Sequence, residues 1–135
     1  MKVKKILLSP VFYTLLAFTF LWTDIIFTGY IIHEASVKGY VLYERHPLGY
    51  TWQAFTRDSL AYGMYIVVAL LTHLISLEAE PKWLKGIVYA TQIALIVRAL
   101  FCMTISTWAI HHNYGVLQIV YALPPKSQTF AFNNT

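Results

Sequence analysis

The sequence has few charged residues and only one cysteine. Aspartate, glutamate, lysine and arginine make up 12% of the 135 residues, whereas an ordinary soluble domain has about 25%. So few charges cannot cover the surface of a soluble domain, and they also exclude a disordered chain. Cys102 stands alone, which excludes an internal disulfide framework and a zinc or iron–sulfur site built from cysteines. The basic residues are scattered, so we expect no nucleic-acid partner.

Catalytic motifs are also absent from the sequence. It contains no Gly-rich phosphate loop, no nucleophile elbow and no paired acids at catalytic spacing, and its six glycines are isolated. The length corresponds to one domain. We therefore predict a single domain that is not an enzyme, and no cofactor is implied.

Apolar residues, by contrast, make up 58% of the chain and gather in three long runs. The first covers residues 6–33 with one charge, and it is too long and too aromatic for a signal peptide. The others cover 59–77 and 83–112. About 20 apolar residues form a helix that spans a bilayer, and only such a helix satisfies its own backbone there. The sequence predicts an all-α fold, an up-down-up bundle of three transmembrane helices whose surface contacts the lipid bilayer.

The connections between these runs are polar and aromatic. Residues 34–58 mix acidic, basic and aromatic side chains and predict an interfacial loop, in which 51–56 can form a short helix. Residues 113–135 are expected to be a tail, although the apolar stretch 116–123 either extends the third helix or lies in the interface. The N-terminus and second loop carry five lysines and arginines, against four in the first loop and tail. This excess favours an N-terminus on the cytoplasmic side.

Asp24 and Arg98 are charged residues inside the first and third runs. A charge in the hydrocarbon costs about 2.5–3.5 kcal/mol on insertion scales. Counted back from His33 and His111, the two residues differ in depth by about 6 Å, so we predict a pair between the helices. Such a pair either stabilises the bundle or forms part of a proton or ion path. The other alternative is that Asp24 simply reaches the interface.

Four histidines fall on one side of the membrane in this topology. His33, His46, His111 and His112 share that side with Glu34 and Glu44. Imidazoles and carboxylates are ligands for zinc, copper or iron, so these histidines are candidate metal ligands. The competing interpretation is that they are ordinary interfacial histidines at helix ends, because no HxxxH or HxxE pattern occurs.

Two short motifs resemble a family of small prokaryotic membrane proteins with three helices and unknown function. The family has Asp-x-x-x-Thr in its first helix, then a Glu-x-Asn-Pro turn and a basic residue in its last helix. Asp24, Thr28, Glu44 and Pro47 match this pattern, while His46 replaces the asparagine and Arg98 stands for the basic residue. The resemblance covers residues 18–48 and, loosely, the third run. It implies no activity, only that these polar residues belong to one site.

The sequence leaves three functional hypotheses. The first is a non-catalytic accessory subunit of a larger membrane complex, for example a respiratory or membrane-oxygenase assembly, with other membrane subunits as partners. The second is a small oligomeric transporter or channel that uses Asp24 and Arg98. The third is a redox protein that binds a metal or haem through the histidines on one side.

Overall fold

The computed structural model describes residues 9–44, 50–78 and 81–126. These residues form three long helices, α2 (Pro10–Val37), α3 (Trp52–Glu78) and α4 (Lys82–Ala122), and no strand occurs within the described ranges. The predicted all-α, three-helix bundle is confirmed. All three helices are long and apolar enough to cross a membrane, which supports an integral membrane protein in contact with lipid.

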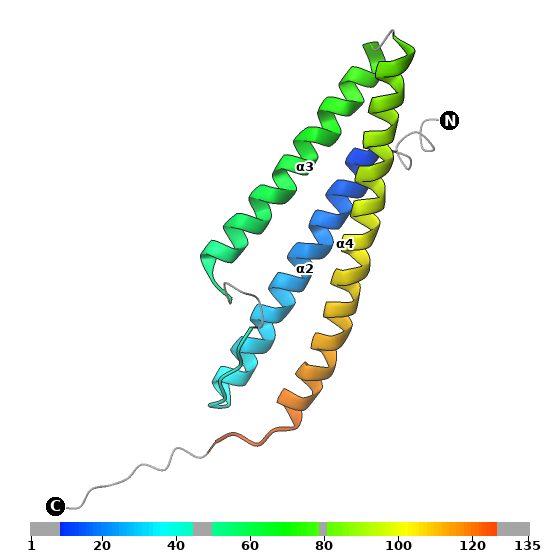
Figure 1. The fold of residues 1–135 in the computed structure, drawn as a ribbon. Helices are drawn as coiled ribbons and strands as arrows, with labels where there is room; N and C mark the ends of the chain where they lie inside the picture. Colours follow the sequence, from blue (N-terminus) through cyan, green and yellow to red (C-terminus); the bar gives the residue numbers. More distant parts are fainter. Residues whose placement is uncertain (1–8, 45–49, 79–80, 127–135) are drawn as a thin grey trace, which may run out of the picture.

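The helices differ in length, and α4 extends along the whole molecule (Figure 1). It has 41 residues, against 27 in α3, so it is about 20 Å longer at 1.5 Å per residue. In Figure 1, α3 lies along the first part of α4 and α2 along the later part. The last turns of α2 and α4 therefore continue together beyond the start of α3. We call residues 26–37 and 108–122 the two-helix extension.

Local sequence signals set the helix ends. Pro10 stands at the first position of α2, where its missing N–H costs nothing. Gly39 ends α2 with a φ of 83°, and its N–H donates to the Ser36 carbonyl at 2.9 Å. At the start of α3, the backbone N–H of Ala54 donates to the Thr51 hydroxyl at 3.3 Å.

Three boundaries differ from those predicted. The first predicted helix ends at residue 33, whereas α2 continues to Val37. The structure begins α3 at Trp52, so 51–56 is not a separate interfacial helix but the first turns of a continuous one. It ends α4 at Ala122, so 113–122 is helix rather than tail. The physical reason is the lack of a breaker: the isolated Gly115 is tolerated within a helix, and only Pro124 and Pro125 prevent continuation.

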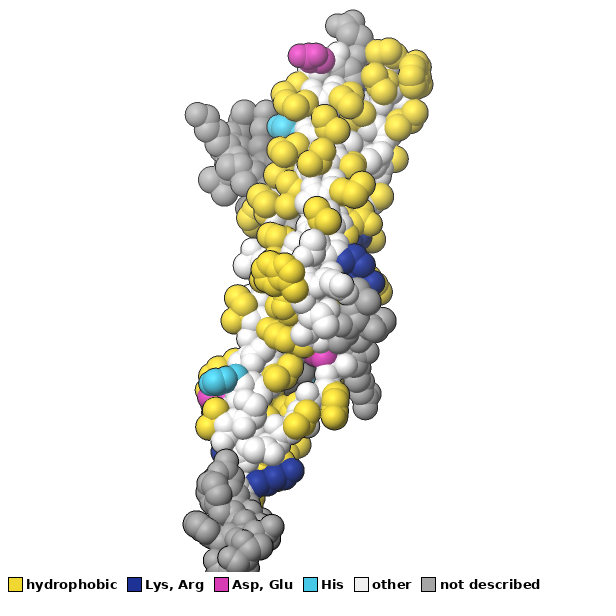
Figure 2. Space-filling view, turned by 90° about the vertical axis from the view of Figure 1, so that its left-hand side faces the viewer, with side chains coloured by type: hydrophobic (Ala, Val, Ile, Leu, Met, Phe, Trp, Pro, Cys, Tyr) yellow, Lys and Arg dark blue, Asp and Glu magenta, His cyan; other side chains and the backbone are white. Residues whose placement is uncertain are grey.

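Alanines occupy several of the helix contacts, while many large apolar side chains face outward. Ala17 and Ala99 meet beside Tyr62 in one buried cluster, and a second forms around Ile31 and Leu117. Membrane helices pack in this way because small side chains let backbones approach closely. Figure 2 shows hydrophobic side chains over nearly all of the upper part of one face, with charged ones at the top, mid-height and lower part. Such a surface suits lipid.

The ends of α2 and α4 are fastened to each other by Lys38. Its ammonium donates to the carbonyl oxygens of Val120, Tyr121 and Leu123 at 2.9, 2.8 and 2.9 Å. These carbonyls include some that the end of a helix leaves without a partner, and a cation is favoured at that negative end of the helix dipole. The N–H of Lys126 in turn donates to the Lys38 carbonyl at 3.0 Å. Residues 123–126 are thus held against the end of α2.

Candidate functional site

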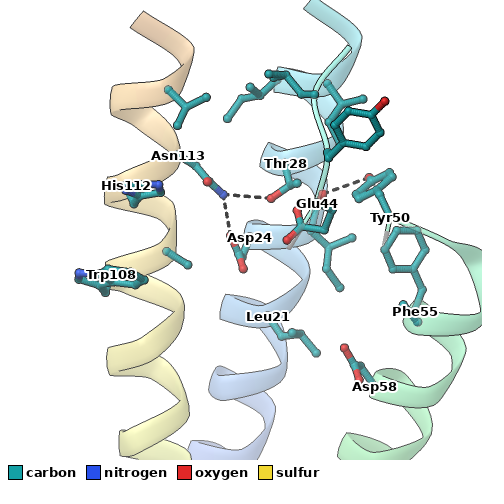
Figure 3. A pocket seen from close by; sticks show the side chains of 18 residues that line it. Leu21, Asp24, Thr28, Glu44, Tyr50, Phe55, Asp58, Trp108, His112 and Asn113 are labelled. Atoms are coloured by element: carbon teal, nitrogen blue, oxygen red, sulfur yellow. Dashed lines mark hydrogen bonds between the residues drawn. The ribbon is translucent and has the colours of Figure 1, made fainter. Parts of the chain in front are cut away.

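A polar bridge joins α2 to α4 at the base of the two-helix extension (Figure 3). The side-chain amide of Asn113 donates to the Asp24 carboxylate at 3.3 Å and to the Thr28 hydroxyl at 3.0 Å. Asp24 and Thr28 are four residues apart on α2, so both face the same side of that helix. The bridge therefore fixes the register of α4 against α2.

This bridge lines a cavity of about 420 Å³. Residues of all three helices and of the first loop line it. The space exists because α3 begins below the two-helix extension and so does not cover that side of α2 and α4. The polar or aromatic side chains that line it are Asp24, Thr28, Tyr43, Glu44, Tyr50, Phe55, Asp58, Trp108, His112 and Asn113. Carboxylates and amide or hydroxyl groups thus share one space with aromatic rings. Chemically, such a cavity favours cations and hydrogen-bond donors over anions.

Tyr50 holds the end of the loop against α2. Its hydroxyl donates to the Ile25 carbonyl at 3.1 Å, and its ring meets Phe55 edge-on at 4.8 Å between centroids. The hydroxyl lies so close to Gly29 that no larger residue fits without displacing it. Burial and, secondarily, the nearby charge of Glu44 raise the pKa of Tyr50. The hydroxyl therefore stays protonated and can donate this hydrogen bond.

The predicted pair of Asp24 and Arg98 is not formed. Asp24 contacts Asn113 instead, while the Arg98 guanidinium carbon lies 3.2 Å from the ring centroid of Tyr65 and 5.2 Å from that of Tyr62. The sequence estimate assumed that α2 and α4 end level at His33 and His111. In the structure Thr28 contacts Asn113, so a residue of α2 lies level with the residue of α4 whose number is 85 higher. Asp24 is therefore level with position 109, and Arg98 lies about 11 residues, or about 16 Å, away along α4.

The histidines that the structure describes do not gather into a metal centre. His33 and His111 are exposed, and His112 stacks on Trp108 with 5.7 Å between the ring centroids. His46 lies outside the described residues. Within 9–44, 50–78 and 81–126, no three histidine, cysteine, aspartate or glutamate side chains lie close enough to hold a metal ion.

The residues that carry the family resemblance have separate outcomes. Asp24, Thr28 and Glu44 line the same cavity, whereas Arg98 lies in another part of the bundle. Pro47 lies outside the described residues. The idea that these polar residues belong to one site thus fits three of them.

Sequence reasoning missed three residues that shape the site. Asn113 falls in the predicted tail, and both Tyr50 and Lys38 fall in the predicted interfacial loop. If the third helix had been continued beyond residue 112, Asn113 would have stood out as a polar residue that could reach Thr28 on the first helix. The contacts of Lys38 and Tyr50 join segments distant in sequence, and no local pattern signals them.

A comparison of the chain with models of known protein families, with curated proteins and with solved structures gives no match. What the protein does must therefore be inferred from the chemistry of its own residues.

Proposed function

We propose that the protein is a non-catalytic accessory subunit of a larger membrane protein complex. The observation that supports this proposal is the apolar surface of the two-helix extension. Its exposed large side chains are Ile26, Tyr30, Val37, Trp108, Tyr114, Ile119 and Tyr121. If lipid does not cover them, another protein must.

The position of the bilayer follows from α3. Between Asp58 and Glu78 the helix has 19 uncharged residues, a length of about 28 Å, which matches a hydrocarbon thickness of about 30 Å. Lys82 and Lys85 then lie at one boundary, and Asp24 lies near the other. On this placement the extension, which begins beyond Asp24, lies outside the hydrocarbon.

Apolar side chains outside the hydrocarbon are exposed to water unless they are covered. Val37 is 70% exposed and Ile119 63%, so each leaves much of its apolar area uncovered. Burial of such area contributes about 25 cal/mol per Å². Surfaces of this kind on a membrane subunit are typical of contacts with a neighbouring subunit. We therefore assign the extension to a partner with a domain outside the bilayer.

The lysine and arginine excess favours an N-terminus and a second loop on the cytoplasmic side. The extension then lies on the opposite side of the membrane. His111→Cys, in a chain with Cys102→Ala, tests this with a thiol reagent that cannot cross membranes, because His111 is exposed on the extension and is not part of the apolar surface. Labelling of intact cells is expected, and labelling only after lysis would reverse the orientation.

Purification of the intact particle tests the proposal itself. The protein is extracted from its native membrane in mild detergent, and the mass and composition of the particle are measured. We expect other membrane subunits in a fixed ratio. Ile119→Ser and Tyr121→Ser are expected to release them, whereas Leu77→Ser, which changes a side chain 71% exposed on α3, is the control and is expected to retain them.

A wild-type protein that runs alone, or only with copies of itself, would contradict the accessory-subunit proposal. Retention of all subunits by both extension variants would leave the complex but remove the extension as its contact surface. The two results are distinguishable because the first concerns wild type and the second only the variants.

The cavity favours one further candidate, a small oligomeric transporter or channel, because Asp24 lines a cavity that opens to the surface of the protein. Loss of ion flux with Asp24→Asn in liposomes of the purified protein would support it. The redox hypothesis stays a prediction, tested by metal content and by a Soret absorption band in the pure protein.

A further inference from the structure

Arg98 carries a positive charge inside the apolar part of α4. Its guanidinium lies over the rings of Tyr65 and Tyr62, with 3.2 and 5.2 Å from the guanidinium carbon to the centroids. The side chain is partly buried. Its two partners are therefore the faces of aromatic rings on the neighbouring helix.

The depth of this charge follows from both helices. Tyr62 and Tyr65 are four and seven residues beyond Asp58, so the guanidinium lies about 6–10 Å inside the apolar run of α3. On α4, Lys85 is thirteen residues away, or about 20 Å. Arg98 is thus well within the hydrocarbon and is held on the tyrosines instead of extending to either boundary.

Two aromatic rings do not replace the hydrogen bonds of a guanidinium. It has five N–H donors and no acceptor of its own, and a cation–π contact contributes only about 0.5–2 kcal/mol. In the part of the chain that the structure describes, no carboxylate or carbonyl accepts a hydrogen bond from Arg98. The two nearest acids along the bundle have other partners: Asp24 accepts from Asn113, and Asp58 pairs with Arg57 at 3.3 Å.

We propose that Arg98 binds a transmembrane helix of another subunit through an aspartate or glutamate at the same depth. A carboxylate accepts two parallel hydrogen bonds from a guanidinium, and this pairing compensates both charges in a medium without water. The inference rests on the accessory-subunit proposal and specifies the chemistry of its partner within the membrane.

A second copy of this chain does not supply that carboxylate. A second copy would lie beside the first in the same orientation, so its Asp24 would differ in depth from Arg98 by about 16 Å. Its Asp58 would be about 6–10 Å from the level of the Arg98 guanidinium and already pairs with Arg57. The partner is therefore a different protein.

The face of α4 next to Arg98 suits a neighbouring helix. Ala94, Phe101 and Ile105 lie at i−4, i+3 and i+7 from Arg98, so they share its outer side. Phe101 is 65% and Ile105 51% exposed. Ala94 is also exposed, and its small side chain lets another backbone approach closely.

The test compares the intact particle for four chains: wild type, Arg98→Gln, Arg98→Lys and Lys85→Gln. Arg98→Gln is expected to reduce the co-purified partner about tenfold or more, since it leaves the partner's carboxylate unpaired in hydrocarbon. Arg98→Lys keeps the charge and is expected to retain more partner than Arg98→Gln. Lys85→Gln removes a charge at the end of α4 and is expected to have no effect.

A photo-crosslinking residue at Phe101 identifies the helix. Leu100, which is 47% exposed and lies about 160° around α4 from Arg98, is the control position. We expect a cross-link to a subunit with an acidic residue at the depth of Arg98. Exchange of the charges, Arg98→Glu together with the partner's acid→Arg, is expected to restore the complex. This rescue separates a lost contact from a misfolded variant.

Three results would overturn the inference while the accessory-subunit proposal stands: full retention of the partner by Arg98→Gln, a cross-linked helix without an acid at that depth, or cross-links to lipid alone. A wild-type chain that purifies without other subunits overturns both.

Discussion

The amide nitrogen of Asn113 lies 3.3 Å from the carboxylate of Asp24, and this contact joins α4 to α2. The same nitrogen donates to Thr28. Asn113→Ala removes both hydrogen bonds, and we expect it to lower the free energy of unfolding by about 1 kcal/mol, since a hydrogen bond between membrane helices averages about 0.6. His111→Ala, an exposed neighbour, is the control for unfolding measured in detergent. Equal stability of the two variants would contradict the bridge.

Gly29 is expected to resist substitution because of Tyr50. Alanine stabilises a helix by up to about 1 kcal/mol relative to glycine, and Gly63→Ala, with open space around it, should gain this. Gly29→Ala instead displaces the Tyr50 hydroxyl, and we expect it to be about 1 kcal/mol less stable than Gly63→Ala. In a Tyr50→Ala background the two alanine variants are expected to become equal. A difference that persists there would show that Tyr50 is not the cause.

Lys38→Met is expected to loosen the end of α4. The methionine keeps the length of the side chain but donates no hydrogen bond, so carbonyls at the last turn lose their partner and the dipole its cation. We expect a loss of about 1–2 kcal/mol and faster hydrogen exchange confined to residues 119–126. Lys85→Met, at the opposite end of α4, provides the comparison. Unchanged exchange in 119–126 would argue against the clamp.

The raised pKa of Tyr50 predicts a pH dependence at alkaline pH. Above pH 10 an unfolded tyrosine loses its proton while the folded one retains it, so the unfolded state is favoured as the pH rises. The contribution of Tyr50 is therefore complete below pH 10 and declines above it. We expect the stability difference between wild type and Tyr50→Phe to be smaller at pH 11 than at pH 8. A constant difference would contradict this.

The sequence predicts the fold well because the bilayer leaves few choices. Long apolar runs with few charges can only become helices, and three runs give three helices. The boundaries were less accurate at the ends of α2 and α4, where the pattern becomes polar while the helix continues. Propensity could not locate those ends, and only Pro124 marks the end of α4 clearly.

The candidate site was predictable only in part. Asp24, Thr28 and Glu44 could be selected because polar residues in an apolar run, or in a motif, stand out. Their partners could not be selected, since the predicted register of α4 against α2 was wrong by about two turns. Arg98 was therefore predicted as the partner of Asp24 in place of Asn113. Register depends on side-chain contacts between helices, and a single sequence contains no direct record of these.

The unbroken length of α4 has a mechanical consequence. A helix of 41 residues is about 61 Å long, so a tilt of about 10° about its Lys82 end displaces Ala122 sideways by about 10 Å. Helices adjust their tilt to the thickness of the bilayer. The lateral position of the cavity and of the apolar surface above it therefore depends on the tilt of α4, to which both the bilayer and the packing of neighbouring helices contribute. A thinner bilayer would present them to a neighbouring protein at a different angle.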